Sequence, residues 1–376
     1  MVKYPSDWNT TTLGFLGDVK MCKRIFQSQT RPFGQIPFYK IGTFGSTPDA
    51  YISRELFKTY KNLYSFPKKG DVMISAAGTI GRTVVYDGKD AYFQDSNIVW
   101  LDIDPDKVDR NFLMYFYQSY PWENLEGTTI RRLYNGIIRN TTIHLPPLPE
   151  QKAIANTLTA FDAHIANLSE LIEKKKAIRD GALEDLVSGR TRLAGFRNNI
   201  VYTTAIGSIQ KVERGKRLVR NQLKYQGDYP VYQNSMLPLG YYDKSNCKPY
   251  SVFIIAAGSA GEIGFSDTAF WAADDCYYLK HHPEICQKYL YYALLREQEY
   301  LRTQSRRTSI PRLSRGVIDD LKLPLPQVCE QKAIADTLTA MDDEITALEA
   351  ERNKMIQIRE GAMDDLLTGR IRLKVS

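Results

Sequence analysis

The stretch EQKAIANTLTAFD at residues 150–162 returns almost unchanged as EQKAIADTLTAMD at residues 330–342. The likeness continues as far as Leu193 and Leu373, and 24 of 44 positions agree without a gap. The segments that precede the two copies differ from each other far more than the copies do. The chain is therefore an internal duplication in which one part of the repeat has stayed alike and the other has diverged.

Apolar residues in both copies recur at alternating steps of four and three, which is the spacing of a coiled-coil seam. Prolines just before each copy, and Gly189 and Gly369 near its end, mark where two long helices begin and stop. Two like seams can pair about a pseudo-twofold axis, which would make the helices antiparallel and place the domains at opposite ends. The predicted seam and partner-binding residues are Ile154, Leu158, Phe161, Ile165, Leu168 and Ile172, then Ile334, Leu338, Met341, Ile345, Leu348 and Met355.

Four cations also fall at seam positions: Lys175, Arg179, Arg352 and Arg359. A charge costs free energy in a dry helix interface unless it is paired. We expect either that the seam frays at these residues or that these faces meet another protein.

The segments before the repeated helices share short islands at the same offset of 180. DVMISAAGTIGR at residues 71–82 parallels SVFIIAAGSAGE at residues 251–262, and the segments from Thr128 and from Thr308 are also related. The apolar run before Ala-Ala-Gly predicts a buried strand that enters a glycine turn. Amphipathic segments such as NFLMYFYQSY add helices, so each domain is predicted to be mixed α/β.

Composition and charge indicate a globular chain with a polyanionic partner. The 376 residues exceed one ordinary core, 43% are hydrophobic, and the net charge is +7. Residues 1–149 and 191–329 carry +4 and +7, whereas residues 150–190 and 330–376 carry −1 and −3. Excess positive charge confined to two domains suggests nucleic acid. With no long apolar run and no signal peptide, we expect a cytoplasmic chain that does not enter a membrane.

No motif for chemistry or metal binding stands out. The five cysteines are scattered without CxxC spacing, and the four histidines show no metal-ligand pattern. The chain also lacks a phosphate-binding loop and a dinucleotide-binding glycine turn. We expect no catalytic residues, no bound metal and no cofactor held by this chain.

The first domain ends in GTT, then NGI, then LPPLPEQ, and leads into a helix that opens EQKAIA and closes with GR and RL. The second domain ends in a related segment and leads into a helix that opens and closes in the same way. This arrangement resembles the specificity subunit of type I restriction-modification enzymes over essentially the whole chain. One departure is Gln-Val-Cys at residues 327–329, where the first copy has Pro-Leu-Pro. This difference affects how partner subunits are expected to dock at the start of the second helix.

The resemblance implies an α+β fold class in which two mixed α/β target recognition domains are joined by two long antiparallel helices. It assigns recognition domains to residues 1–149 and 191–329, a central helical region to 150–190 and a C-terminal helical region to 330–376. It implies a bipartite double-stranded DNA site, two methyltransferase subunits and restriction subunits as partners. S-adenosylmethionine, ATP and Mg would then enter only through those partners, and the chain itself would not be an enzyme.

Cationic and polar residues in the related islands are the candidates for DNA contact, because phosphates bind cations and base edges bind arginine, amides and carboxylates. In the first domain they are Arg82, Thr128, Thr129, Arg131, Arg132, Tyr134 and Asn135. In the second they are Arg214, Lys216, Arg217, Glu262, Arg306, Arg307, Thr308, Ser309, Arg312 and Arg315. Arg82 and Glu262 occupy equivalent turn positions and favour guanine and cytosine respectively, so we predict that the domains read different bases there.

Two other interpretations are open at this point. The chain could be a self-sufficient enzyme that modifies nucleic acid through an unrecognised active site, or a coiled-coil scaffold whose basic domains bind acidic proteins. If the two domains bind one face of a duplex, their half-sites should be centred on the order of 10 base pairs apart.

Overall fold

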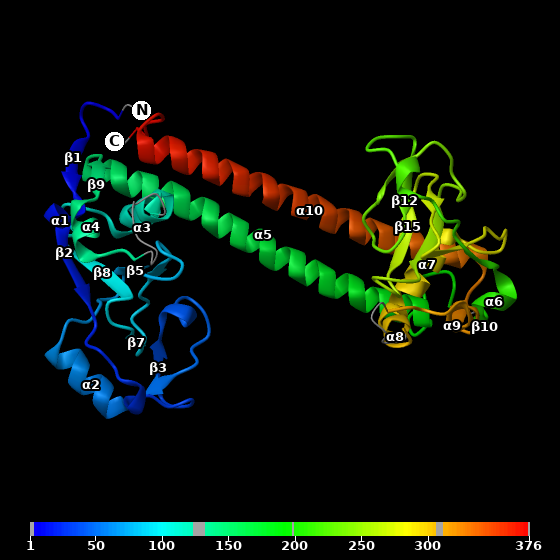
Figure 1. Ribbon diagram of the computed structural model, residues 1–376, viewed down its shortest axis with the longest axis horizontal. Coiled ribbons are helices and arrows are strands. Elements are labelled where there is room, and N and C mark those ends of the chain that lie inside the picture. The colour runs from blue at the N-terminus through cyan, green and yellow to red at the C-terminus, as the bar shows by residue number, and fades with distance from the viewer. Residues whose placement is uncertain (1–3, 123–131, 198, 306–310, 375–376) are drawn as a thin grey trace. The chain divides into compact units, whose positions relative to one another are not determined.

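The computed structural model describes residues 4–122, 132–197, 199–305 and 311–374, which fold as two compact units (Figure 1). Unit 1 comprises residues 1–167 and 351–376, and unit 2 comprises residues 168–350. Each unit contains one globular domain and part of each of two 41-residue helices, α5 (Leu148–Ser188) and α10 (Val328–Thr368). The two helices begin at equivalent positions of the repeat, so the Gln-Val-Cys departure does not shift the start of α10.

Domain 1, the globular part of unit 1, is built on three small sheets. A four-stranded antiparallel sheet has the order β2-β8-β5-β6, a three-stranded sheet has the order β4-β3-β7 with β3 and β7 parallel, and β1 pairs with β9. The strands are β1 (Asn9–Thr12), β2 (Gly17–Met21), β3 (Ile36–Tyr39), β4 (Tyr51–Ile52), β5 (Val72–Ser75), β6 (Thr83–Val85), β7 (Tyr92–Phe93), β8 (Ile98–Ile103) and β9 (Thr142–Leu145). The helices are α1 (Leu13–Leu16), α2 (Arg54–Leu63), α3 (Arg110–Ser119) and α4 (Asn135–Asn140).

Domain 2, the globular part of unit 2, repeats this topology strand for strand. Its sheets have the orders β11-β17-β14-β15 and β13-β12-β16, and β10 pairs with β18. The strands are β10 (Tyr202–Ala205), β11 (Val212–Arg214), β12 (Tyr229–Tyr232), β13 (Gly240–Tyr242), β14 (Ser251–Ile255), β15 (Ile263–Ser266), β16 (Trp271–Ala272), β17 (Cys276–Leu279) and β18 (Lys322–Leu325). The helices are α6 (Ile206–Ile209), α7 (Gln287–Arg296), α8 (Gln298–Thr303) and α9 (Arg315–Asp319).

The sequence prediction of a duplicated α+β fold is confirmed. Every residue of β5 and of β14 is buried, as expected for the apolar run before each glycine turn. The segment NFLMYFYQSY forms α3, where the side chain of Asp109 accepts hydrogen bonds from the first turn and caps the helix. Among the described residues, α2 of domain 1 has no helical counterpart between β13 and β14.

The two long helices run antiparallel within each unit. In unit 2, Lys175 pairs with Glu344 and Arg179 pairs with Asp342, so the partner's number falls as the residue number rises. In unit 1, Asp162 pairs with Arg359 and His164 lies 3.9 Å from Glu351, so the partner's number falls there too.

The ionic motif residues at the ends of the repeat pair with each other. In unit 1 the guanidinium of Arg372 donates to both carboxylate oxygens of Glu150, at 2.6 and 2.7 Å. In unit 2 Arg192 donates to both oxygens of Glu330, at 2.6 and 2.5 Å. Both carboxylates are buried. The Glu that opens one helix is thus held by the Arg that follows the other, which explains why EQ and RL are retained together in both copies.

The glutamine that follows each of these glutamates holds the helix to its own domain. Gln151 accepts a hydrogen bond from Asp109 N at 2.9 Å and donates to the carbonyls of Lys107 and Pro146. Gln331 makes the same three contacts in domain 2. Both side chains are buried, so each amide has its hydrogen bonds satisfied only in this docked position.

The aspartate that closes the repeated stretch links domain and helix. Asp162 accepts a hydrogen bond from the Tyr115 hydroxyl at 2.7 Å and one from Arg359 Nε at 3.0 Å. Burial, with a contribution from this carboxylate, raises the pKa of Tyr115 to about 12, so the hydroxyl stays protonated and can donate. Tyr292, Asp342 and Arg179 form the equivalent triad in unit 2.

The structure shows neither of the two arrangements expected for the four seam cations, which were a frayed seam or contact with another protein. Three of the four are paired with carboxylates of the opposite helix: Lys175 with Glu344 at 2.6 Å, Arg179 with Asp342 at 3.0 Å and Arg359 with Asp162 at 3.0 Å. For these three the seam neither frays nor needs an outside partner, because the antiparallel register brings an acid opposite each cation. The fourth, Arg352, donates to the side chain of Asn353 at 3.4 Å.

The predicted seam residues divide between two kinds of packing. Ile154 and Leu158 lie in the core of domain 1, and Ile334 and Leu338 lie in the core of domain 2. Leu168, Ile172 and Ile345 are buried as well, whereas Phe161, Ile165, Met341, Leu348 and Met355 are half-buried. The first turns of each helix are therefore part of a globular core rather than of a two-helix seam alone.

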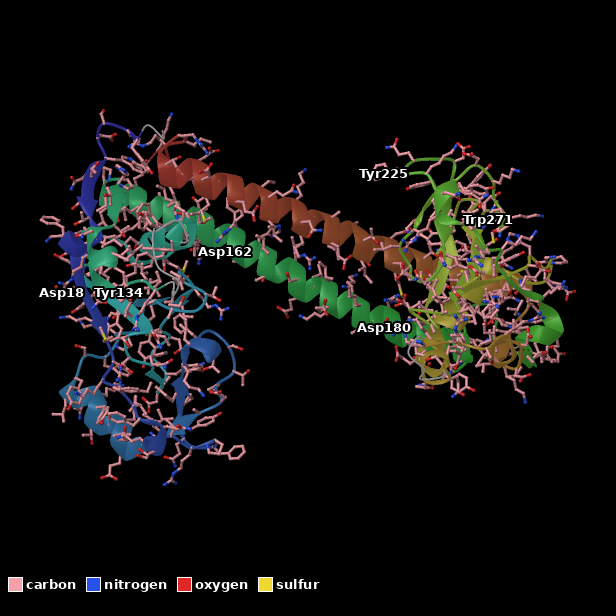
Figure 2. All side chains as sticks on the ribbon, viewed as in Figure 1. Asp18, Tyr134, Asp162, Asp180, Tyr225 and Trp271 are labelled. Atoms are coloured by element: carbon pink, nitrogen blue, oxygen red, sulfur yellow. The ribbon has the colours of Figure 1, made fainter. Side chains whose placement is uncertain are left out.

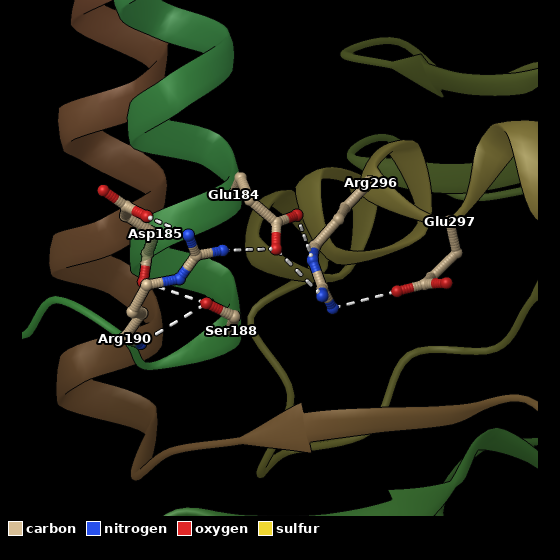
Figure 3. A network of polar contacts seen from close by, with 6 residues as sticks. All are labelled: Glu184, Asp185, Ser188, Arg190, Arg296 and Glu297. Carbon is tan, nitrogen blue, oxygen red and sulfur yellow. Dashed lines mark hydrogen bonds and ion pairs between the residues drawn. The ribbon is translucent and has the colours of Figure 1, made fainter.

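Unit 2 has a further ionic attachment between α5 and its domain (Figure 3). Arg296 at the end of α7 donates to both oxygens of Glu184, at 2.6 and 3.2 Å, and Arg190 pairs with the same carboxylate at 2.8 Å. The hydrogen bond from Arg296 lowers the pKa of Glu184.

No helix in the described part of the chain is long and apolar enough to cross a membrane.

Candidate nucleic-acid interface

Each domain contains a glycine turn that directly follows the central buried strand. Gly78 and Gly81 in domain 1, and Gly258 and Gly261 in domain 2, have φ between +64° and +92°. A Cβ atom at Gly258 would lie 2.6 Å from Asn234 O, and one at Gly261 would lie 2.8 Å from Arg302 N. Only glycine fits there, and the turn is held tightly against neighbouring backbone.

The turn is joined to the segment that leads into α4 or α9. Ala77 forms an isolated bridge with Arg132, and Ala257 forms one with Arg312. In both domains the following leucine donates its N–H to the alanine before the bridge, at 2.8 Å. The structure thus brings together the two islands that the sequence singled out, and it does so identically in the two domains.

A third segment, the turn before β8 or β17, lies against the same glycine turn. Asn97 O accepts a hydrogen bond from Ala76 N at 2.8 Å, and Asp275 O accepts one from Ala256 N at 2.7 Å. In domain 1 the guanidinium of Arg132 also donates to Ser96 O at 3.0 Å.

The fourth segment follows β3 or β12. In domain 1, Ile41 N donates to Gln94 Oε1 at 2.9 Å, and Arg82 donates to Phe44 O at 3.0 Å. In domain 2, Ser259 N donates to Asn234 O at 3.0 Å. We call these four converging segments the recognition cluster of each domain.

Domain 2 has a pocket within its recognition cluster that contains several charged side chains. The pocket has a volume of about 360 Å³ and is lined by Arg214, Asp275, Arg312, Ser314 and neighbouring residues. Arg214 Nε donates to Asp274 O at 2.6 Å, and Gln233 lies 3.5 Å from the Asp275 carboxylate. Two exposed guanidinium groups beside a carboxylate can contact phosphates and base edges together.

The predicted DNA-contact residues have different surroundings. In domain 1, Tyr134 is exposed at the start of α4, as Figure 2 shows, with the Arg132 guanidinium over its ring; Asn135 is the first residue of that helix. In domain 2, Arg315 pairs with Asp319, and the Lys216 carbonyl accepts a hydrogen bond from Trp271. Arg217 is exposed. Thr128, Thr129, Arg131, Arg306, Arg307, Thr308 and Ser309 lie outside the described residues.

The Arg82 and Glu262 pair has a structural role in addition to its predicted one. Arg82 holds the Phe44 carbonyl, and Glu262 lies 3.6 Å from Arg302. That the two domains read different bases at this position remains a prediction.

Sequence analysis missed the fourth segment and part of the third, which supply Lys40, Gln94, Gln233, Asn234 and Asp275. A signal directly before the fourth segment, in the loop and strand that lead into it, was present at an offset of 193 instead of 180. Gln29, Arg31, Gly34, Pro37 and Tyr39 correspond there to Gln222, Lys224, Gly227, Pro230 and Tyr232. Loops of unequal length between the strands shift the offset, so a search at one fixed offset cannot find this island.

The described residues contain no group of three or more His, Cys, Asp or Glu side chains placed to hold a metal ion. The five cysteines are free thiols. Burial raises the pKa of the Cys22 and Cys247 thiols to about 12, so these two are unreactive at neutral pH.

The chain is thus a duplication in which one repeated framework presents two equivalent recognition clusters, whose side chains differ in part. The type I restriction modification DNA specificity domain matches residues 5–176 and 201–357 of this chain. The chain belongs to this family, as a specificity subunit and not a catalytic one.

Individual relatives agree with this assignment. A putative type I restriction enzyme specificity subunit of Haemophilus influenzae is 54% identical over 158 residues, which cover 42% of this chain and 41% of that relative. A putative type I specificity subunit of Mycoplasma genitalium is 23% identical over 96% of this chain and 94% of its own length. The crystal structure of a type I S subunit from M. genitalium has the same fold, with a TM-score of 0.67 and 21% identity, covering 100% of this chain and 99% of that one.

Proposed function

We propose that this chain binds a bipartite double-stranded DNA site, one half-site for each domain, and carries two methyltransferase subunits. In a complex that also cleaves DNA, it would hold restriction subunits as well. The observation that carries the proposal is that equivalent recognition clusters have unlike side chains. Lys40, Gln94 and Asn97 in domain 1 occupy the positions of Gln233, Ala273 and Asp275 in domain 2. The bridging Arg132 and Arg312 are the same in both.

The charge distribution supports DNA as the ligand. The segments that form the two domains carry the excess positive charge, whereas residues 150–190 and 330–376 are slightly negative. Cations of the domains would neutralise phosphates and supply affinity, and the recognition clusters would supply base contacts and specificity. S-adenosylmethionine, ATP and Mg would be bound by the partner subunits.

Methylome sequencing tests the proposal. A cell that carries this chain with its partner subunits is expected to show one methylated motif made of two short blocks separated by unread base pairs. A matched strain that lacks only this chain should lose the motif. A continuous motif, or methylation that persists without the chain, would contradict the proposal.

A pair of exposed helix faces supports the docking of two equal partners. Ile178 of α5 and Ile358 of α10 occupy the same position of the repeat and are both exposed. Three residues later each helix has a glycine, Gly181 or Gly361, whose missing Cβ would meet nothing within 4 Å. Glycine inside a helix costs about 0.5–1 kcal/mol relative to alanine, and no described residue comes close enough to either position to require it there. We infer that the space admits close approach by the same partner surface at each helix.

Replacing Ile178 with glutamate is expected to reduce the number of bound methyltransferase subunits from two to one, and adding Ile358→Glu should remove the second. A charge in the centre of an interface typically costs more than about 2 kcal/mol. Native mass spectrometry of co-purified complexes gives the stoichiometry. Glu173→Ala, on the opposite side of α5 from Ile178, is the matched control and should keep two subunits. Two subunits retained by the double variant would contradict the inferred docking face.

A further inference from the structure

The island found at offset 193 forms the same loop in both domains. It opens with a 3₁₀ turn that a glutamine side chain closes. Gln29 Oε1 accepts a hydrogen bond from Phe26 N at 2.9 Å, and Gln222 Oε1 accepts one from Val219 N at 3.2 Å. The beginning of the loop is therefore fixed in the same way in each copy.

The backbone of a cationic residue then pairs the loop with the neighbouring strand. Arg31 exchanges two backbone hydrogen bonds with Tyr51, at 2.9 and 2.8 Å, and Lys224 exchanges two with Tyr241, both at 2.9 Å. The backbone of these two residues is therefore held at an equivalent point of the loop in each domain.

The far side of the loop is anchored by glycine. A Cβ atom at Gly34 would lie 2.7 Å from Tyr51 Cβ, and one at Gly227 would lie 3.0 Å from Tyr241 Cβ. The glycine backbone therefore packs directly on the tyrosine that pairs with the cation. Both ends of the tip are held by one residue of the adjacent strand.

Two residues form the tip between cation and glycine, and one of them is aromatic in each domain. The tip is Pro32-Phe33 in domain 1 and Tyr225-Gln226 in domain 2. Phe33 is 82% exposed and Tyr225 is 92% exposed, and Figure 2 shows Tyr225 on a peripheral loop of its domain. The two rings stand at neighbouring and not identical tip positions, since Phe33 corresponds to Gln226 and Tyr225 to Pro32. An exposed ring on a loop tip can be covered by a ligand that binds there.

Cations lie close to both tips along the chain. Arg31 and Arg24 lie on the loop segment of domain 1, and Arg217, Arg220 and Lys224 lie on that of domain 2. Lys224 pairs with Asp243 at 2.6 Å, but both side chains are exposed and a phosphate can replace such a pair in water. Positive charge beside an exposed ring suits nucleic acid, because phosphates take the charge and the ring meets the bases.

In domain 1 the loop continues into the recognition cluster. Arg31 and Pro32 line a pocket of about 590 Å³ together with Lys40 and Gln94. Gln94 belongs to the turn that carries Ser96, whose carbonyl is held by Arg132. A duplex that meets the recognition cluster would therefore also reach this tip.

We propose that Phe33 and Tyr225 each insert between two base pairs of one half-site, at the edge of the block that its domain reads, so that the ring partly unstacks these base pairs from each other. Arg31 and Lys224 hold the adjacent phosphate. This inference rests on the proposed function and adds to it a pair of side chains that contact bases through stacking instead of hydrogen bonds.

The test uses the full chain with its methyltransferase subunits and a duplex that carries the methylated motif. 2-Aminopurine, whose fluorescence rises when it is unstacked, replaces one base at a time along each half-site. The wild-type complex is expected to raise fluorescence at one position in each half. Phe33→Ala should abolish the change in one half only, and Tyr225→Ala should abolish it in the other. Each substitution should weaken binding by roughly five- to 150-fold.

Salt dependence separates stacking from charge. Phe33→Ala should leave the slope of log affinity against log salt concentration unchanged, whereas Arg31→Ala should reduce it by about one.

Phe33→Tyr and Tyr225→Phe should keep both fluorescence and affinity, because the ring remains. Tyr64→Ala and Tyr300→Ala remove exposed rings outside the tips and serve as matched controls. An unchanged unfolding temperature of the alanine variants would show that they fold.

Each unfavourable result has a distinct meaning. If the wild-type complex binds no DNA, the proposed function fails. If it binds DNA and both alanine variants match it in affinity and fluorescence, only this inference is overturned. If the variants lose a protein subunit but keep DNA binding, the rings belong to a protein interface and the inference is likewise overturned.

Discussion

Replacing Arg192 with alanine is expected to lower the free energy of unfolding of unit 2 by about 3–5 kcal/mol, because it leaves a buried carboxylate without its counter-charge. The side chain of Glu330 is only 1% exposed and that of Arg192 16% exposed. The two make a bidentate pair at 2.6 and 2.5 Å, and the Glu330 carboxylate raises the pKa of Arg192.

The measurement is urea unfolding of the full chain, followed by hydrogen exchange in the first turns of α10. Hydrogen exchange is needed because two units need not unfold in a single step. Arg190→Ala is the matched control, since Arg190 is exposed and its pairs with Glu184 and Asp185 are worth at most about 1 kcal/mol. A double variant, Arg192→Met with Glu330→Leu, should recover most of the loss, because both charges are then gone. A cost for Arg192→Ala as small as that of the control would contradict the assignment.

Lengthening both long helices by one heptad is expected to widen the gap between the two methylated blocks by about three base pairs. Seven helical residues add roughly 10 Å, and base pairs in a duplex are about 3.4 Å apart. A heptad keeps the seam in phase, so the added residues continue the same pairing. The insertion is a copy of residues 166–172 placed after Ile172 in α5 and a copy of residues 342–348 placed after Leu348 in α10.

Methylome sequencing of cells that carry this variant gives the new motif. The two blocks themselves should be unchanged, since the insertion leaves both recognition clusters intact. Inserting the heptad into α5 alone is the control and should abolish methylation, because the ion pairs of Lys175 and Arg179 with α10 then fall out of register. An unchanged gap in the double insertion would show that the helices do not set the spacing.

Much of the framework could be predicted from sequence because it rests on local patterns. Apolar residues at alternating steps of four and three predicted both long helices. The apolar runs before Gly78 and Gly258 predicted the central strands. The related islands also pointed to Arg132 and Arg312, which the structure places on the glycine turns. Conformational preference and periodicity act over a few residues, so they can be recognised without knowing what the segment packs on.

The contacts between distant segments could not be obtained in this way. Arg372 and Glu150 are 222 positions apart, and nothing near either residue in the sequence indicates that they pair. The seam cations were expected to be unfavourable because their partners, such as Asp342 and Asp162, become neighbours only in the antiparallel register. Lys40 and Asp275 were missed because loops of unequal length hid the equivalence of their segments.

By itself, the sequence determined that the chain is duplicated, that each copy is a mixed α/β domain followed by a long helix, and that positive charge is confined to the domains. Only the tertiary structure decided which side chains meet: the Glu–Arg pairs at the helix ends, the four converging segments and the two anchored aromatic tips. The physical reason is that helix and strand formation depend on neighbours in the chain. Buried ion pairs and surface clusters depend on neighbours in space, which the folded backbone alone specifies.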